Sequence, residues 1–143
     1  MKNIKVLLCS LVAGFSLTSF AMAEAELDGY CPVCYVSAGK AVKGTEEFKS
    51  EHNGDTYYFV HAEAKAAFDK EPTKFLPAYE GFCAYGISLG KEIESDPTQF
   101  TVIDGVIYLS ATAKIKARFE TRSSRFIAKA NRQWKIIMAK KEQ

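Results

Sequence analysis

Two stretches of alternating apolar and polar residues, 48–52 and 55–60, predict a β-hairpin because Asn53-Gly54 lies between them. Both residues of this dipeptide tolerate the positive φ that a two-residue type I′ turn requires. The turn fixes the register, which pairs His52 with Asp55, Ser50 with Tyr57 and Phe48 with Phe59. In that register Phe48, His52, Tyr57, Phe59 and His61 share one face, and we expect that face to point to the core.

The same pattern predicts a second hairpin, in which residues 100–103 and 106–109 flank Asp104-Gly105. Between the hairpins, residues 79–90 are rich in glycine and aromatic side chains and are expected to form a packed loop. The residues that follow Cys34 give poor evidence for a helix, and no internal repeat is evident.

Three helices are predicted from composition and period. Residues 62–70 are rich in alanine and end before Pro72, and residues 111–119 and 122–140 close the chain. The expected fold class is therefore α+β, with a small antiparallel sheet built from two hairpins, short helices and a longer C-terminal helix.

The first 23 residues are typical of a signal peptide. Lys2 and Lys5 precede an apolar run, 6–20, and Ala21-Met22-Ala23 provides a cleavage site. We expect a single domain over 24–143 that is periplasmic or secreted after cleavage near Ala23. The apolar run is shorter than the roughly 20 residues of a membrane-spanning helix, so no stable membrane insertion is expected.

Charge is unevenly distributed along the mature chain. The sequence has 19 Lys and Arg and 17 Asp and Glu, and removal of Lys2 and Lys5 makes the rest formally neutral. Residues 111–143 nevertheless hold ten basic and two acidic side chains. Such a tail could bind nucleic acid or an anionic membrane surface, but export argues against nucleic acid. The favoured interpretation is a solvated helix face, with Arg122, Arg125, Lys129 and Arg132, docked on an acidic body.

Cys31-Pro32-Val33-Cys34 is the most informative motif. Two thiolates at this spacing can converge on one soft metal ion such as Cu(I) or Zn(II). They can equally form a structural disulfide in an oxidising compartment, or act as a thiol redox pair. The spacing leaves these alternatives open.

Further ligands would have to come from Cys83 or the histidines. Cys83 could also be a small buried hydrophobe. His61 could cap a helix or fill the core, and His52 is expected to be a cross-strand partner of Asp55. No Ser-His-Asp set, phosphate-binding loop or pair of catalytic carboxylates is visible, so an enzyme is not favoured.

Many short segments of the chain, taken in order, resemble the YHS domain family and specifically its exported bacterial branch. They are Gly29 to Tyr35, Lys40 to Gly44, Asn53-Gly54 with Thr56 to Phe59, Phe68 with Glu71 to Leu76, Tyr79 to Gly86, Asp96-Pro97, Val102 to Gly105, Ile107 to Leu109 and Ala128 to Trp134. The resemblance implies a YHS core of about 28–80 with an extension over 81–143, and it implies metal handling.

The chain departs from the metal-linked pattern of that family, because Val60 and Ala64 stand where two further cysteines would fall. The leading hypothesis is an exported metal-binding or metal-handling protein. Its site would be Cys31 and Cys34 with Cys83 or His61 as a third ligand, its ion Cu(I) rather than zinc, and its partner a metal-transport or redox protein. The alternatives are a thiol-disulfide redox protein and a structural or interaction domain stapled by a disulfide.

Overall fold

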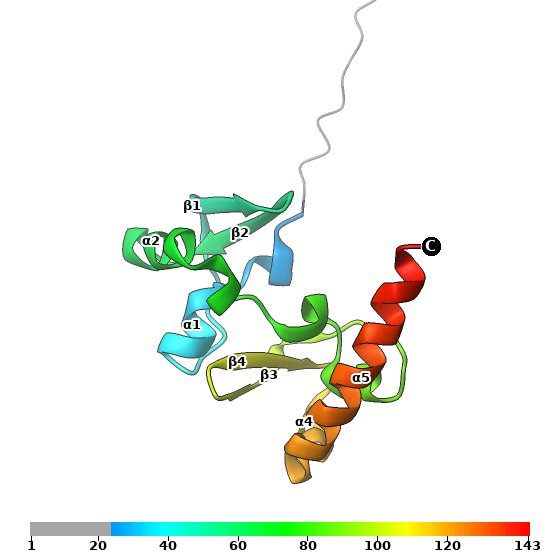
Figure 1. Ribbon diagram of the computed structural model, residues 1–143. Helices are drawn as coiled ribbons and strands as arrows, with labels where there is room; N and C mark the ends of the chain where they lie inside the picture. The colour runs from blue at the N-terminus through cyan, green and yellow to red at the C-terminus, as the bar shows by residue number, and fades with distance from the viewer. Residues whose placement is uncertain (1–23) are drawn as a thin grey trace, which may run out of the picture.

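The computed structural model describes residues 24–143, and the predicted signal peptide lies outside this range (Figure 1). The fold is α+β, as predicted. Its strands are β1 (Thr45–His52), β2 (Asp55–Phe59), β3 (Asp96–Ile103) and β4 (Val106–Ser110). Its helices are α1 (Pro32–Ser37), α2 (Ala62–Lys70), α3 (Ala84–Ser88), α4 (Ala113–Thr121) and α5 (Ser123–Lys141), and its short 3-10 turns are η1 (Glu26–Gly29), η2 (Pro72–Lys74) and η3 (Ala78–Gly81).

Both predicted hairpins are present, with positive φ at the two central residues of each turn. They form two separate two-stranded antiparallel sheets rather than one. His52 pairs with Asp55, and Ser50 with Tyr57, as predicted. The predicted pairing of Phe48 with Phe59 is wrong, because a bulge in β1 shifts the register so that Thr45 lies opposite Phe59.

Two short helices lie where none was predicted. Helix α1 follows Cys31 directly, and α3 occupies part of the stretch predicted to be a packed loop. Pro32 occupies the first helical position, where a backbone N–H would have no partner within the helix, so its lack of an N–H costs nothing there. Its fixed φ also suits the start of a helix. Helices this short are held by burial rather than by propensity, and most residues of both are buried.

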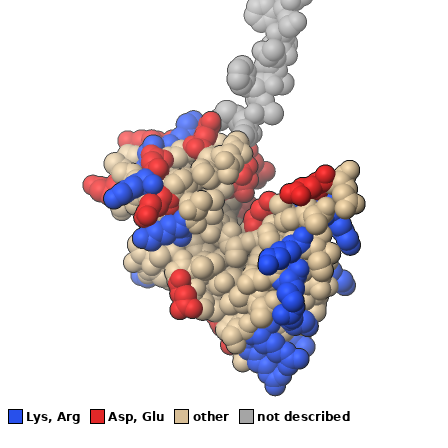
Figure 2. Space-filling model, viewed as in Figure 1, with Lys and Arg blue, Asp and Glu red and all other residues tan. Residues whose placement is uncertain are grey.

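The C-terminal helix α5 packs its apolar side against α3, α4 and η3. That side consists of Phe126, Ile127, Ala130, Trp134 and Ile137. The predicted solvated face is confirmed at Arg122, Arg125 and Arg132, which are exposed. The ion pairs of the helix with acidic residues of the body are made by Lys141, with Glu80 and Glu92. The remaining basic side chains line the outer edge of α4 and α5 (Figure 2). Among residues 24–143, no helix combines the length and apolar character needed to cross a bilayer.

The chain contains an internal structural repeat that is not evident from its sequence. The first unit, 26–74, runs η1, α1, β1, β2, α2, and the second unit, 78–141, runs η3, α3, β3, β4, α4 before adding α5. Each unit opens with two consecutive non-glycine residues at positive φ, followed by a glycine. The cysteine two residues after this glycine, Cys31 or Cys83, then donates its N–H to the carbonyl of Val42 or Ile93, at 2.8 and 2.9 Å.

The strands repeat this correspondence. The bulge between Thr45 and Lys49 in β1 recurs between Asp96 and Phe100 in β3. Helices α2 and α4 have equal lengths, and each carries a buried phenylalanine, Phe68 or Phe119, two residues before its end. The bulges and the buried phenylalanines recur 51 residues apart and the cysteines 52 apart, so the two units share one local architecture.

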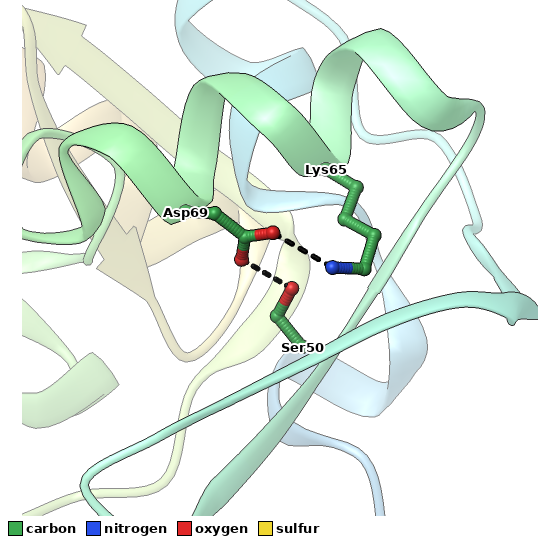
Figure 3. Close-up of polar contacts among 3 residues, drawn as sticks. All are labelled: Ser50, Lys65 and Asp69. Atoms are coloured by element: carbon green, nitrogen blue, oxygen red, sulfur yellow. Dashed lines mark hydrogen bonds and ion pairs between the residues drawn. The ribbon is translucent and has the colours of Figure 1, made fainter.

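Even side-chain contacts recur between the units. In the first, Asp69 of α2 accepts a hydrogen bond from Ser50 of β1 at 2.5 Å and pairs with Lys65 at 2.7 Å (Figure 3). We call this contact the clasp of the first unit, since it ties the helix to the hairpin.

The clasp of the second unit has the same parts at the corresponding positions. Glu120 of α4 accepts from Thr101 of β3 at 2.9 Å and pairs with Lys116 at 2.7 Å. Both units therefore contain the same three groups. A hydroxyl comes from the bulged strand, and a lysine and a carboxylate lie one turn apart on the helix.

Each unit has its own apolar core, and a third cluster joins them. Tyr35 of α1 packs with Ile107 and Leu109 of β4, and all three are at most 1% exposed. The Tyr35 hydroxyl donates to the carbonyl of Pro97 in the second unit at 2.9 Å, and this bond is buried. Its burial holds the pKa of the Tyr35 phenol well above the ordinary value. The junction therefore fixes α1, and with it the Cys-Pro-Val-Cys motif, against the second unit.

Candidate thiol site

The two cysteines of the motif are held by the backbone at the start of α1. Cys31 is the extended residue that precedes the helix, and its N–H bonds to Val42. The N–H of Cys34 donates to the Cys31 carbonyl at 3.1 Å, which closes the first turn. The two thiols thus lie one helical turn apart, where their side chains are neighbours.

Both thiols are buried in the core of the first unit. Cys31 is 0% and Cys34 7% exposed, and they pack in one cluster with Val33, Tyr57, Phe59, Ala64, Phe68 and Phe75. All three described cysteines are free thiols. Aromatic and aliphatic side chains therefore shield the pair from solvent.

Burial, and after it the neighbouring Cys31 thiol, raises the pKa of the Cys34 thiol to about 12. At neutral pH Cys34 is a neutral thiol, so it is a poor nucleophile. Both side chains belong to the same packed cluster, one turn apart on the chain. A soft cation that displaced the protons would meet two sulfur atoms at once.

Cys83 occupies the corresponding position in the second unit, before α3, and is 1% exposed. The position that matches Cys34 is Gly86. A Cβ at Gly86 would lie 3.0 to 3.1 Å from side-chain atoms of Ile93, so this place is already filled. The second unit therefore has one thiol and no room for its neighbour.

His61 does not lie on the buried face, and that prediction is wrong. Its side chain is 58% exposed, and Nδ1 accepts a hydrogen bond from the N–H of Ala64 at 3.1 Å. The residue caps α2, as the alternative interpretation held, and Thr112 caps α4 at the corresponding position through Ile115. The strand ends before His61, so the alternation that predicted its face no longer applies.

His52 pairs with Asp55 across the hairpin and lies beside the turn, where Nε2 is 3.3 Å from Nδ2 of Asn53. Within residues 24–143, no three His, Cys, Asp or Glu side chains gather as a metal-binding group. Cys83 and His61 are thus not brought together with the Cys31 and Cys34 pair into such a group. The local arrangement offers a soft cation two thiols.

The signal that would have revealed the repeat lies at the cysteines themselves. Gly29-Tyr30-Cys31 matches Gly81-Phe82-Cys83, and each follows an acidic residue. The match is short and its continuation diverges, since Pro32-Val33-Cys34 stands against Ala84-Tyr85-Gly86. Comparison of the chain with models of known families, with curated proteins and with solved structures gives no match.

Proposed function

We propose that this protein is exported and binds Cu(I), with Cys31 and Cys34 as a pair of thiolate ligands. The observation that carries the proposal is the pairing of two buried cysteines, one turn apart at the start of one helix and packed in one apolar cluster. Thiolates select soft ions, and an apolar surrounding excludes competing water. The resemblance to YHS domains, which are associated with metal handling, supports the same role.

The size of the ligand set favours Cu(I) over zinc. Structural zinc is almost always bound by four ligands in a tetrahedral arrangement. The described residues offer two thiols here and no third side chain in a metal-binding group. Cu(I) is the soft ion that this donor set suits, and the function would be to hold or pass on this ion rather than to catalyse a reaction.

A second candidate function uses the same pair as a reversible disulfide. It is favoured by the position of Cys31, which immediately precedes a helix with Cys34 one turn later, as in thiol-disulfide oxidoreductases. Two observations weaken it as an enzyme: Cys31 is fully buried, and the pKa of Cys34 is raised rather than lowered. A disulfide that staples the first unit remains the corresponding structural role.

The test is an anaerobic Cu(I) titration of periplasmically expressed protein against a colorimetric Cu(I) chelator. We expect one ion per chain, and Cys31→Ser or Cys34→Ser should weaken binding by about a hundredfold or more because one of two ligands is lost. Cys83→Ser is the matched control, since it removes an equally buried thiol from the corresponding place and should leave the titration unchanged.

The pH dependence provides a second readout. Because burial raises the pKa of Cys34, Cu(I) binding must release the thiol proton. The apparent affinity for Cu(I) should therefore fall about tenfold for each pH unit by which the pH is lowered, for each proton displaced. Uptake of less than about 0.2 equivalents of Cu(I) by the reduced protein would rule out the metal proposal. If the pair also oxidised reversibly, with a potential near that of redox enzymes, the second candidate would replace it.

A further inference from the structure

Helices α4 and α5 carry a continuous basic surface, which we call the basic ridge. It consists of Lys114, Arg118, Arg122, Arg125, Lys129, Arg132, Lys135 and Lys140. Figure 2 shows these helices as an edge of the molecule dominated by Lys and Arg. Among the described residues, none of the eight takes part in an ion pair.

The stability of the fold does not account for this arrangement. Arg125 and Lys129 are four residues apart on one helix, and Arg132 is three residues further, so their charges repel along the same face. The apolar side of α5 packs on the second unit without their help. The repulsion would be relieved by an anionic partner along the length of the helix.

Two large apolar side chains lie exposed beside the ridge. Ile136, one turn after Arg132, is 49% exposed, and Leu89 is also 49% exposed. Leu89 lies next to Gly90, where a Cβ would be 3.1 Å from Oε1 of Gln133 in α5. Binding of a protein to a membrane surface increases with electrostatic attraction to anionic lipid and with the apolar area that enters the lipid, and the ridge with its two aliphatic neighbours offers both.

We propose that the basic ridge docks on an anionic phospholipid surface. An α-helix of 19 residues spans about 28 Å, which is long enough to contact several headgroups at once. Three hollows on the surface of residues 24–143 are lined by residues outside α4 and α5, so the ridge matches an extended surface better than these small-ligand sites. The predicted export favours a membrane over nucleic acid.

The same charge distribution orients the molecule on the surface. Acidic residues, among them Glu26, Glu80 and Glu94, line the hollow that lies between the units. Anionic lipid repels this region and attracts the ridge. Figure 1 places α4 and α5 on the opposite side of the molecule from α1 and α2, so the unit with Cys31 and Cys34 faces away from the lipid.

The test is co-sedimentation of the exported, processed protein with vesicles. Vesicles of phosphatidylcholine alone are compared with vesicles that contain about 30% phosphatidylglycerol, at about 25 and about 300 mM NaCl. We expect binding to the anionic vesicles only, and its loss at the higher salt. Absence of binding to anionic vesicles at low salt overturns the proposal and leaves an acidic protein as the occupant to seek.

The ridge variant Arg125→Gln/Lys129→Gln/Arg132→Gln should reduce partitioning by about tenfold to a hundredfold. The matched control is Lys40→Gln/Lys70→Gln/Lys74→Gln, which removes the same charge from exposed positions of the first unit and should retain most of the binding. An equal loss in both variants would mean that net charge and not the ridge is responsible. Circular dichroism checks that α5 remains folded, and Ile136→Ser should weaken binding about two- to fivefold if the aliphatic side chain enters the lipid.

Discussion

The two units share a backbone and differ in chemistry. Each has the same opening turn and the same bulged hairpin. Each also has a capped helix with a buried phenylalanine in its last turn, and a clasp of hydroxyl, lysine and carboxylate. The first unit buries two adjacent thiols. The second buries one, fills the other place with Ile93 and adds α5. The architecture has therefore been kept while the thiol pair and the basic helix are divided between the units.

The comparison of the units separates cysteines that the fold requires for packing from a cysteine that only a binding site would require. Cys31 and Cys83 are both buried where the chain enters the short helix, so a cysteine there serves packing in either unit. Cys34 has no such counterpart, since the second unit does without a side chain at Gly86. The second thiol of the motif is therefore the residue that the local architecture does not require.

The largest expected effect is the gain of a second thiol pair. Gly86→Cys combined with Ile93→Ala places a thiol in the second unit and removes the side-chain atoms that block it. We expect Cu(I) uptake to rise from one to two ions per chain in the anaerobic titration. Gly86→Cys alone should lower the free energy of unfolding by about 1–3 kcal/mol because it overpacks the site.

The control for this experiment is Gly86→Ser/Ile93→Ala, which has nearly the same shape without the added thiol. Its uptake should stay at one ion per chain. If the cysteine variant folds, yet binds no second ion and forms no disulfide with Cys83 on oxidation, the two places are not chemically equivalent.

A smaller effect tests whether the units are equally important for stability. Phe68 and Phe119 are 1% and 0% exposed at corresponding positions. Phe68→Ala and Phe119→Ala should each lower the free energy of unfolding by about 3–5 kcal/mol, measured by urea denaturation. Ile136→Ala is the control, since a half-exposed side chain should change stability by less than about 0.5 kcal/mol.

Both variants should unfold in a single transition, because the Tyr35 junction couples the two cores. Two separate transitions in either variant would show that the junction is weak. The units would then be independent domains, contrary to the single-domain expectation.

The smallest effect concerns the clasps and their dependence on pH. Lys65 and then Ser50 hold the pKa of Asp69 below its ordinary value, and Lys116 and then Thr101 do the same for Glu120. A carboxyl group with a lowered pKa in the folded state stabilises the protein above its unfolded pKa, and this contribution is lost as pH falls. Because the groups are partly exposed, each clasp should contribute no more than about 1 kcal/mol.

Asp69→Asn and Glu120→Gln should therefore lower stability slightly at pH 7 and make almost no difference near pH 2–3, in parallel urea titrations. Glu47→Gln, an exposed carboxylate of β1 outside the clasps, serves as the control. A deficit that persisted unchanged at low pH would mean that the carboxylates act through packing rather than charge.

Local sequence signals predicted the elements with strong patterns. Asn53-Gly54 and Asp104-Gly105 fixed both turns, since few dipeptides tolerate two positive φ values in succession. The alanine-rich stretch before Pro72 gave α2 its observed bounds. The bulge in β1, and so the partner of Phe59, was not predictable because an inserted residue leaves no mark in a simple alternation.

The sequence by itself determined the two turns, the longer helices, the separation of charge and the presence of one Cys-x-x-Cys pair. These depend on residues that are neighbours in the chain. Only the tertiary structure decided that Cys31 and Cys34 are buried, that His61 caps a helix, and that Cys83 belongs to a second copy of the same unit. Burial, and the closure of Gly86 by Ile93, arise from contacts between distant residues, which local periodicity does not encode.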